Sequence, residues 1–251
     1  MDADAAGRAG HEAKALWRFA AGSTIGLAAG VTGLALPIAL ILLASYSPGT
    51  IYLTGAQLVE ATAILALAGA LLFALSLWVY RLGFSMLQRS DKRFYVASVL
   101  AWIGTVGVLL VVVAIGIAFL SSGTMSGCIQ AAPANSLACL HAAAPLASYS
   151  GVLGFWLVWL GGLGVVFGIG LAGTRYHQLW FYGGAGVYSL LLLGLIAPAL
   201  SLVFPIDPPA FLLLATPLLA AFGPAAIFHG ARRSVGGHWT PTPTESRPAQ
   251  G

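Results

Sequence analysis

The stretch WVYRLGFSMLQRSDKRFY, residues 78–95, lies between two long apolar runs and decides how the rest of the chain is read. It carries four of the eleven basic residues of the protein, which are Arg81, Arg89, Lys92 and Arg93. Basic residues concentrate in the cytoplasmic turns of membrane proteins. A basic turn between two apolar runs therefore indicates which ends of the flanking helices face the cytoplasm, and we take these four residues as topology-determining.

Composition places the chain in the membrane class. Hydrophobic residues make up 59% of its 251 residues and charged residues only 7%, against about 25% charged in ordinary globular domains. Apolar runs of about 20 residues recur along the chain, and each is long enough to cross a hydrocarbon core about 30 Å thick. The pI near 9.3 is explained by the basic turns, so nucleic acid is not an expected partner. We predict an all-α, multi-pass helical bundle in the cell membrane, with the lipid bilayer as its first partner.

Six spans are predicted, and they divide the chain into three parts. Residues 1–20 form a cytoplasmic amphipathic lead-in, residues 21–230 a six-helix transmembrane domain, and residues 231–251 a disordered cytoplasmic tail. Gly230 is expected to end the last helix, and Pro37 is expected to kink the first. The spans run approximately over residues 24–44, 54–80 with an extension to 87, 94–120, 149–173, 179–204 and 209–229.

The distribution of Lys and Arg fixes the predicted orientation. With six spans, all eleven basic residues fall on one side of the membrane, and the three loops on the other side contain none. The positive-inside rule then places both termini in the cytoplasm, an N-in/C-in topology. The external loop at residues 121–148 holds Cys128 and Cys139, with ten residues between them. A disulfide is favoured over two free thiols because this loop faces an oxidising compartment. With His141, the two cysteines fall short of the four ligands of a structural zinc site.

No cofactor is expected. The five histidines fall in tails, loops or span ends, whereas a buried haem needs an axial ligand from the protein, usually His. No span offers an Asp pair or a Ser–His arrangement, so we do not expect an enzyme. The match of Gly168–Gly173 to G-x-G-x-x-G lies in an apolar span with no strand before it, so helix packing explains it better than dinucleotide binding.

Glu60 is the one ionisable residue inside a predicted span. Carboxylates within a membrane are costly and often functional, so Glu60, Gln57 and His141 form a possible polar or ion site. A solvated interfacial or capping role for Glu60 is the favoured alternative, because it lies only about six residues into its span. Aromatic residues near the basic turns fit an interfacial belt, and they are Trp78, Tyr80, Trp180, Phe181 and Tyr182.

The first half of the chain resembles an archaeal multi-pass membrane family, the domain of unknown function 973 family. The resemblance is carried by residues 11–16 (HEAKAL) before a Gly-rich first span, by residues 81–84 (RLGF) with Leu87, and by residues 91–94 (DKRF) before a Gly-containing third span. It covers about the first 120 residues, and the later spans match only in hydropathy. That family has no established activity, so the resemblance implies a topology and no site.

The sequence leads to two functional expectations from different classes. The first is a structural or accessory subunit of a membrane complex, packed against other subunits or itself, because small residues are abundant and suit close helix association. The alternative is a channel or transporter for a small solute or ion, in which Pro-broken helices expose backbone carbonyls and Glu60 stands at the entrance. A membrane enzyme acting on lipid has no motif to support it. A continuous polar path would favour transport over the accessory role.

Overall fold

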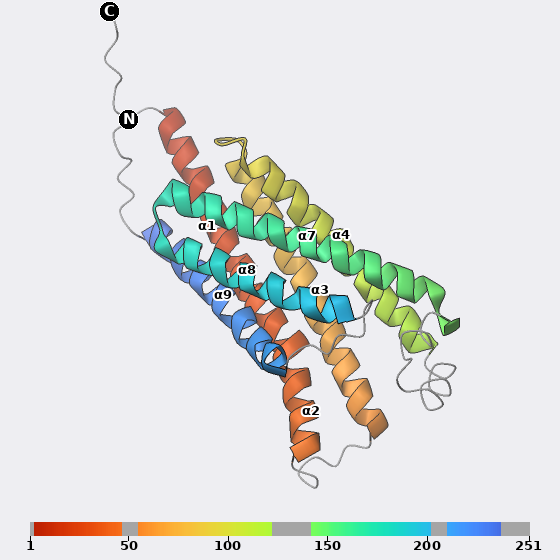
Figure 1. The fold of residues 1–251 in the computed structure, drawn as a ribbon. Coiled ribbons are helices and arrows are strands. Elements are labelled where there is room, and N and C mark those ends of the chain that lie inside the picture. The colour runs from red at the N-terminus through yellow and green to blue at the C-terminus, as the bar shows by residue number, and fades with distance from the viewer. Residues whose placement is uncertain (1–2, 47–54, 122–141, 202–209, 237–251) are drawn as a thin grey trace, which may run out of the picture.

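The protein is represented by a computed structural model that describes residues 3–46, 55–121, 142–201 and 210–236. Within these ranges the backbone is helical and contains no strand (Figure 1). The all-α class predicted from the sequence is therefore confirmed for the described part of the chain. Cys128, Cys139 and His141 lie outside the described residues, so the disulfide stays a prediction.

Eight helical segments follow one another among the described residues. They are α1 (Ala3–Gly30), the π-helical turn η1 (Val31–Ala35), α2 (Leu36–Tyr46), α3 (Gly55–Leu87), α4 (Phe94–Leu120), α7 (Pro145–Tyr176), α8 (Leu179–Ser201) and α9 (Ala210–Gly236). Four stretches of this part of the chain are long and apolar enough to cross a membrane, and they are Gly10–Leu40, Glu60–Leu87, Phe94–Leu120 and Pro145–Tyr176. Leu179–Leu193 forms a shorter apolar helix.

The helices close into a ring. In the order α1, α3, α4, α7, α8, α9, each helix packs against the next, and α9 packs back against α1. In Figure 1 the start of α1, the turn between α3 and α4, the turn between α7 and α8 and the end of α9 all lie at one end of the bundle. This end carries the basic turn at residues 88–93, so we call it the basic end.

A π-helical turn precedes Pro37. The Leu36 N–H donates to the carbonyl of Val31, five residues back, instead of the usual four. Proline lacks an N–H and its ring collides with the carbonyl four residues before it, and a π-turn is one way in which a helix absorbs such a break. The sequence-based expectation of an irregularity at Pro37 thus corresponds to a change in the hydrogen-bonding pattern.

Glycine sets how closely neighbouring helices approach. A Cβ placed on Gly104 of α4 would lie 2.6 Å from the Cα of Gly161 on α7, closer than real Cβ atoms come. A Cβ on Gly33 of η1 would lie 3.1 Å from the Cα of Gly69 on α3. Small residues allow backbones in a membrane to pack this tightly, and the gain is van der Waals contact. Helix packing also explains Gly168, where an added Cβ would lie 2.5 Å from the ring of Phe84.

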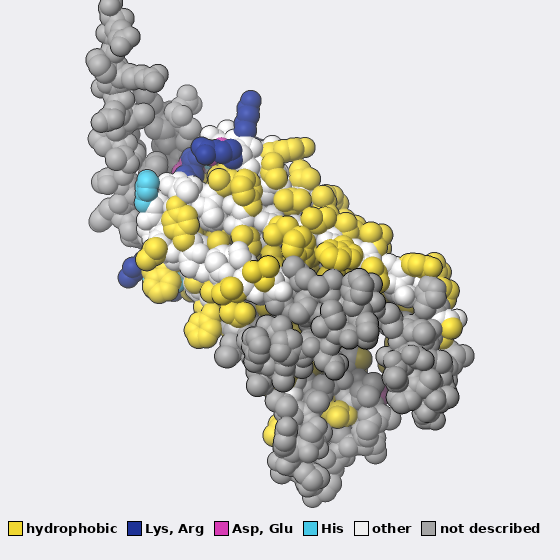
Figure 2. Space-filling view, viewed as in Figure 1, with side chains coloured by type: hydrophobic (Ala, Val, Ile, Leu, Met, Phe, Trp, Pro, Cys, Tyr) yellow, Lys and Arg dark blue, Asp and Glu magenta, His cyan; other side chains and the backbone are white. Residues whose placement is uncertain are grey.

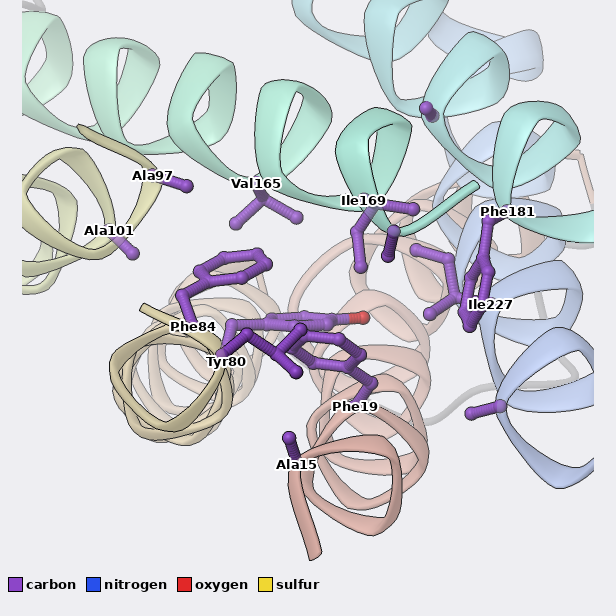
Figure 3. Close-up of a cluster of buried hydrophobic side chains, with 14 of the residues drawn as sticks. Ala15, Phe19, Tyr80, Phe84, Ala97, Ala101, Val165, Ile169, Phe181 and Ile227 are labelled. Carbon is purple, nitrogen blue, oxygen red and sulfur yellow. The ribbon is translucent and has the colours of Figure 1, made fainter. Parts of the chain in front are cut away.

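Aromatic residues form the core near the basic end. The rings of Phe19 and Phe84 lie 5.1 Å apart (Figure 3), and those of Phe84 and Phe94 lie 6.3 Å apart. Tyr80 is 1% exposed and Phe181 is fully buried. Their assignment to an interfacial belt is therefore wrong. Both side chains face the inside of the bundle. The Tyr80 ring packs against Phe19 of α1. The Phe181 ring packs against Tyr176 of α7 and against Gly230 of α9.

Two predicted boundaries differ from the structure. The helix expected to end at Gly230 continues to Gly236, because Gly230 is a packing residue whose missing side chain admits Trp180 and Phe181. The loop expected at residues 121–148 gives way to α7 at Pro145, in the first turn where proline is tolerated. In addition, the lead-in at residues 1–20 belongs from Ala3 onward to the same helix as the first span.

Candidate functional site

A central cavity of about 340 Å³ lies inside the ring of helices. This volume is at the lower end of the range for small-molecule sites. Every helix of the ring contributes to the lining, which consists of Gly26, Ala29, Gly30, Gly33, Leu34, Ala66, Gly69, Ala70, Phe73, Val108, Val111, Phe155, Val158, Tyr188, Leu191 and Ala220. The cavity is therefore a product of the whole bundle and belongs to no single pair of helices.

The cavity owes its space to small side chains. Gly26, Gly30 and Gly33 repeat along α1 and η1, and Ala66, Gly69 and Ala70 face them from α3. Phe73 of α3, Phe155 of α7 and Tyr188 of α8 supply broad apolar surfaces. Such a lining suits an apolar occupant, because a desolvated ion would find no compensating charge among these residues.

A cluster of hydroxyl groups borders the cavity at Gly26. Ser76 of α3 donates to the carbonyl of Gly22 at 2.7 Å, and the hydroxyls of Ser23 and Tyr80 lie 2.8 Å apart. The hydroxyls of Tyr80 and Tyr188 interact across the bundle. A Cβ on Gly26 would lie 3.0 Å from the Ser76 hydroxyl and 3.3 Å from that of Tyr188. The cluster therefore joins α1, α3 and α8 directly beside the cavity wall.

These hydroxyl groups satisfy one another. Among the described residues, no buried side-chain nitrogen or oxygen lacks a hydrogen-bond partner. A fully bonded polar cluster stabilises one arrangement of the helices. Of its four hydroxyls, only that of Tyr188 belongs to a residue that lines the 340 Å³ cavity.

Aromatic side chains are part of the core near the basic end. The buried residues Phe19, Phe84, Phe94 and Phe181 belong to the hydrophobic core cluster, and Figure 3 shows Phe19, Phe84 and Phe181. Among the residues that line the cavity, none carries a charged side chain.

Two ion pairs order the basic end. Arg175 at the end of α7 pairs with Glu12 of α1, and the Tyr176 hydroxyl lies 3.5 Å from the same carboxylate. In the turn after α3, the backbone N–H of Arg93 donates to Asp91 at 3.0 Å, and the Arg93 guanidinium lies 3.3 Å away. The hydrogen bond from this N–H, helped by the positive charge of Arg93, holds the pKa of the Asp91 carboxyl below its ordinary value.

The topology-determining residues separate into two environments. Arg89, Lys92 and Arg93 are exposed in the turn between α3 and α4. Arg81 instead lies along α3, where its guanidinium carbon is 4.6 Å from the ring centroids of both Trp78 and Trp102. On the face seen in Figure 2, Lys and Arg side chains gather at the basic end.

The candidate polar site around Glu60 is only partly described. Glu60 and Gln57 are exposed near the start of α3, and neither belongs to the cavity lining. His141 lies outside the described residues, so its proximity to Glu60 stays a prediction. No group of three His, Cys, Asp or Glu side chains that could hold a metal ion occurs in the described part of the chain.

Sequence reasoning did not identify the hydroxyl cluster. The available signal was the spacing of Ser76, Tyr80 and Phe84, which recur every four residues and so lie on one face of α3. Comparison with protein-family models, with curated proteins and with solved structures finds no match. The site is therefore defined by the physical chemistry of this chain.

Proposed function

We propose that the chain is a six-span membrane protein of the cell membrane with both termini in the cytoplasm. The four long apolar helices support this proposal. We assign α8 and α9 as the fifth and sixth spans because they pack into the same ring. Exposed basic residues at the basic end agree with the positive-inside rule. Accessibility of tags placed at the two termini in sealed vesicles tests the topology, and opposite accessibility of the two tags would refute it.

Within the membrane, we infer a non-enzymatic accessory role in which the bundle packs against another subunit or a second copy. The observation that carries this proposal is the set of glycines that face outward. Gly183 and Gly186 of α8 are exposed, and an added Cβ at either would meet nothing within 4 Å. The backbone of α8 is thus open at these two positions. Exposed glycine permits the close approach of a further transmembrane helix.

Native mass spectrometry of mildly solubilised source membranes tests the accessory role, together with an absorption spectrum of the same fraction. We expect the full chain to migrate with other subunits or as a homo-oligomer, and Gly183→Leu with Gly186→Leu to release it. Gly116→Leu is the matched control, because Gly116 is an exposed glycine of α4 that also meets nothing within 4 Å. A wild-type chain that migrates alone would overturn the proposal.

The central cavity favours a second candidate function, the passage of a small neutral solute. Its apolar lining restricts the solute class, and a charged solute would have to shed its hydration without compensation. Ala70→Phe, which fills the cavity, is expected to abolish solute flux into liposomes. Glu60→Gln tests whether Glu60 acts as an entrance residue. Flux unchanged by Ala70→Phe would exclude the cavity as the route.

A further inference from the structure

Arg81 is held in a fixed position on the side of the bundle. Its guanidinium carbon lies 4.6 Å from the ring centroid of Trp78, on its own helix, and 4.6 Å from that of Trp102 on α4. The two ring centroids are 5.3 Å apart. The three groups therefore form a compact triangle across the α3–α4 contact, and the cation is attracted to the faces of both rings.

This triangle lies about two turns from the end of α3, on a partly exposed surface that faces lipid in the proposed topology. Arg81 precedes the end of α3 at Leu87 by six residues, which corresponds to about 9 Å along the helix. Trp102 is eight residues into α4 and is 42% exposed. A positive charge at this depth is costly unless a polar group accompanies it.

The described part of the protein supplies no anion to Arg81. The carboxylate of Glu12 pairs with Arg175, and that of Asp91 pairs with Arg93. Glu60 lies 21 residues earlier on the same helix, about 32 Å away along its axis. Among the described residues, no ion pair or hydrogen bond engages the guanidinium of Arg81. Its charge is balanced only by the two aromatic faces.

We propose that Arg81, Trp78 and Trp102 form a binding site for the phosphate of an anionic phospholipid in the leaflet at the basic end. The contacts with the two indole rings restrict the position of the guanidinium. A guanidinium edge offers two parallel N–H donors, which match two oxygens of a phosphate. The site goes beyond the accessory role, because it requires no protein partner.

The surface next to the triangle suits the acyl chain of such a lipid. Leu75 and Leu71 lie one and two turns before Trp78 on the same face of α3, farther from the basic end, and both are 48% exposed. Leu109 follows Trp102 by two turns on α4 and is 49% exposed. An apolar track therefore leads from the guanidinium away from the basic end, in the direction in which a lipid tail runs.

A purely topological role for Arg81 makes a different prediction. Any positive charge near the basic end would serve the positive-inside rule equally well, and Arg89 in the exposed turn would be equivalent to Arg81. A phosphate site instead requires the planar fork and the two rings. Arg81→Lys keeps the charge but loses the bidentate geometry and the stacking, so it separates the two roles.

Native mass spectrometry of the full-length, delipidated protein tests the site, with phosphatidylglycerol, phosphatidylcholine of matched chains, and inorganic phosphate as the added probes. We expect phosphatidylglycerol to bind wild type most tightly. Arg81→Gln should bind it at least about tenfold more weakly, as the loss of a charge-assisted hydrogen bond predicts. Arg81→Lys should also weaken it, whereas Arg89→Gln should bind as wild type does.

The other possible results would overturn the proposed lipid site or reassign it. Equal loss of phosphatidylglycerol binding in Arg81→Gln and Arg89→Gln would overturn the proposal in favour of general electrostatic attraction. Loss of binding in neither variant would also overturn it. Binding of inorganic phosphate with the same dependence on Arg81 would assign the site to free phosphate instead of lipid. Should Arg81→Gln fail to fold, Trp102→Leu retains every charge, and unchanged lipid binding in that variant would refute the site. The lipid-binding test does not depend on the accessory role. It can succeed even if the chain migrates without other subunits when the source membranes are solubilised.

Discussion

Ser23 and Tyr80 are 57 positions apart in the chain, and their hydroxyl oxygens lie 2.8 Å apart in the buried centre of the bundle. Ser23 also donates to the carbonyl of Phe19, one turn earlier on α1, at 2.7 Å. Since one hydroxyl hydrogen cannot serve both contacts at once, Tyr80 is the donor to Ser23 when Ser23 donates to Phe19. This pair ties α1 to α3 at the level where the aromatic core meets the cavity.

Tyr80→Phe is expected to lower the free energy of unfolding by about 1–3 kcal/mol, because the buried hydroxyl contacts both Ser23 and Tyr188 and its loss leaves a buried partner unsatisfied. The ring remains, so the packing on Phe19 and Phe84 is preserved. Thermal unfolding in detergent measures the change. Tyr95→Phe is the control, because Tyr95 is 57% exposed on α4. An effect of Tyr80→Phe no larger than that of Tyr95→Phe would show that the hydroxyl contact adds nothing.

Gly161→Ala is expected to lower stability by about 1–3 kcal/mol, the usual cost of overpacking. The added methyl group would meet the backbone of Gly104, which has no flexible side chain to move aside. Gly170→Ala in the same helix is the matched control, because a Cβ there meets nothing within 4 Å. The control should be neutral or more stable by up to about 1 kcal/mol through helix propensity. Similar melting temperatures for the two variants would contradict the close α4–α7 contact.

His177→Gly is expected to raise stability by about 1 kcal/mol. His177 ends α7 with φ of 50°, in the left-handed region, and it is the only described residue other than glycine with positive φ. A side chain in that region costs roughly 1–2 kcal/mol, and glycine avoids the cost. Part of the gain is offset by the larger entropy of glycine in the unfolded chain. Thermal unfolding checks the sign, with His177→Val as the variant expected to be less stable than wild type.

Asp91 should contribute a pH-dependent part of the stability. Its folded pKa lies below its ordinary value because the backbone N–H of Arg93 donates to the carboxylate. The contribution is therefore fully present above the unfolded pKa of about 3.9, and it is lost as the pH falls through the lower folded pKa. Asp91→Asn keeps an acceptor oxygen but cannot titrate. The stability difference between wild type and Asp91→Asn should shrink below pH 4, and a constant difference across that range would refute the pairing.

The proposed disulfide between Cys128 and Cys139 predicts a simple chemical result. Under non-reducing conditions neither cysteine should react with an alkylating reagent, and both should react after reduction. Mass spectrometry of the intact chain measures the number of labels. Two labels without prior reduction would remove the disulfide, and removal of the bridge by Cys→Ser substitution should loosen the external segment.

The positions of Gly230 and Tyr80 show where sequence reasoning stops. A glycine near the end of an apolar run predicts a helix end, yet α9 passes through Gly230 because Trp180 and Phe181 need its space. A tyrosine beside a basic turn predicts an interfacial role, yet Tyr80 faces α1 and is buried. Both predictions failed because the deciding neighbours, Trp180 and Phe181 for Gly230 and Phe19 for Tyr80, come from distant parts of the chain.

The amino-acid sequence by itself determined the all-helical class, the presence of helices long and apolar enough to cross a membrane, the approximate ends of several helices and the basic character of one end. These follow from composition, run length and the placement of eleven charges, which are local properties. Only the tertiary structure decided the order of the ring, the cavity, the hydroxyl cluster and the position of Arg81 between two tryptophans. The physical reason is that lipid is as apolar as the interior of the bundle, so a span shows no contrast between its outward and inward faces. Which face turns inward is decided by the fit of glycines against neighbouring backbones, and that fit exists only once the helices have packed.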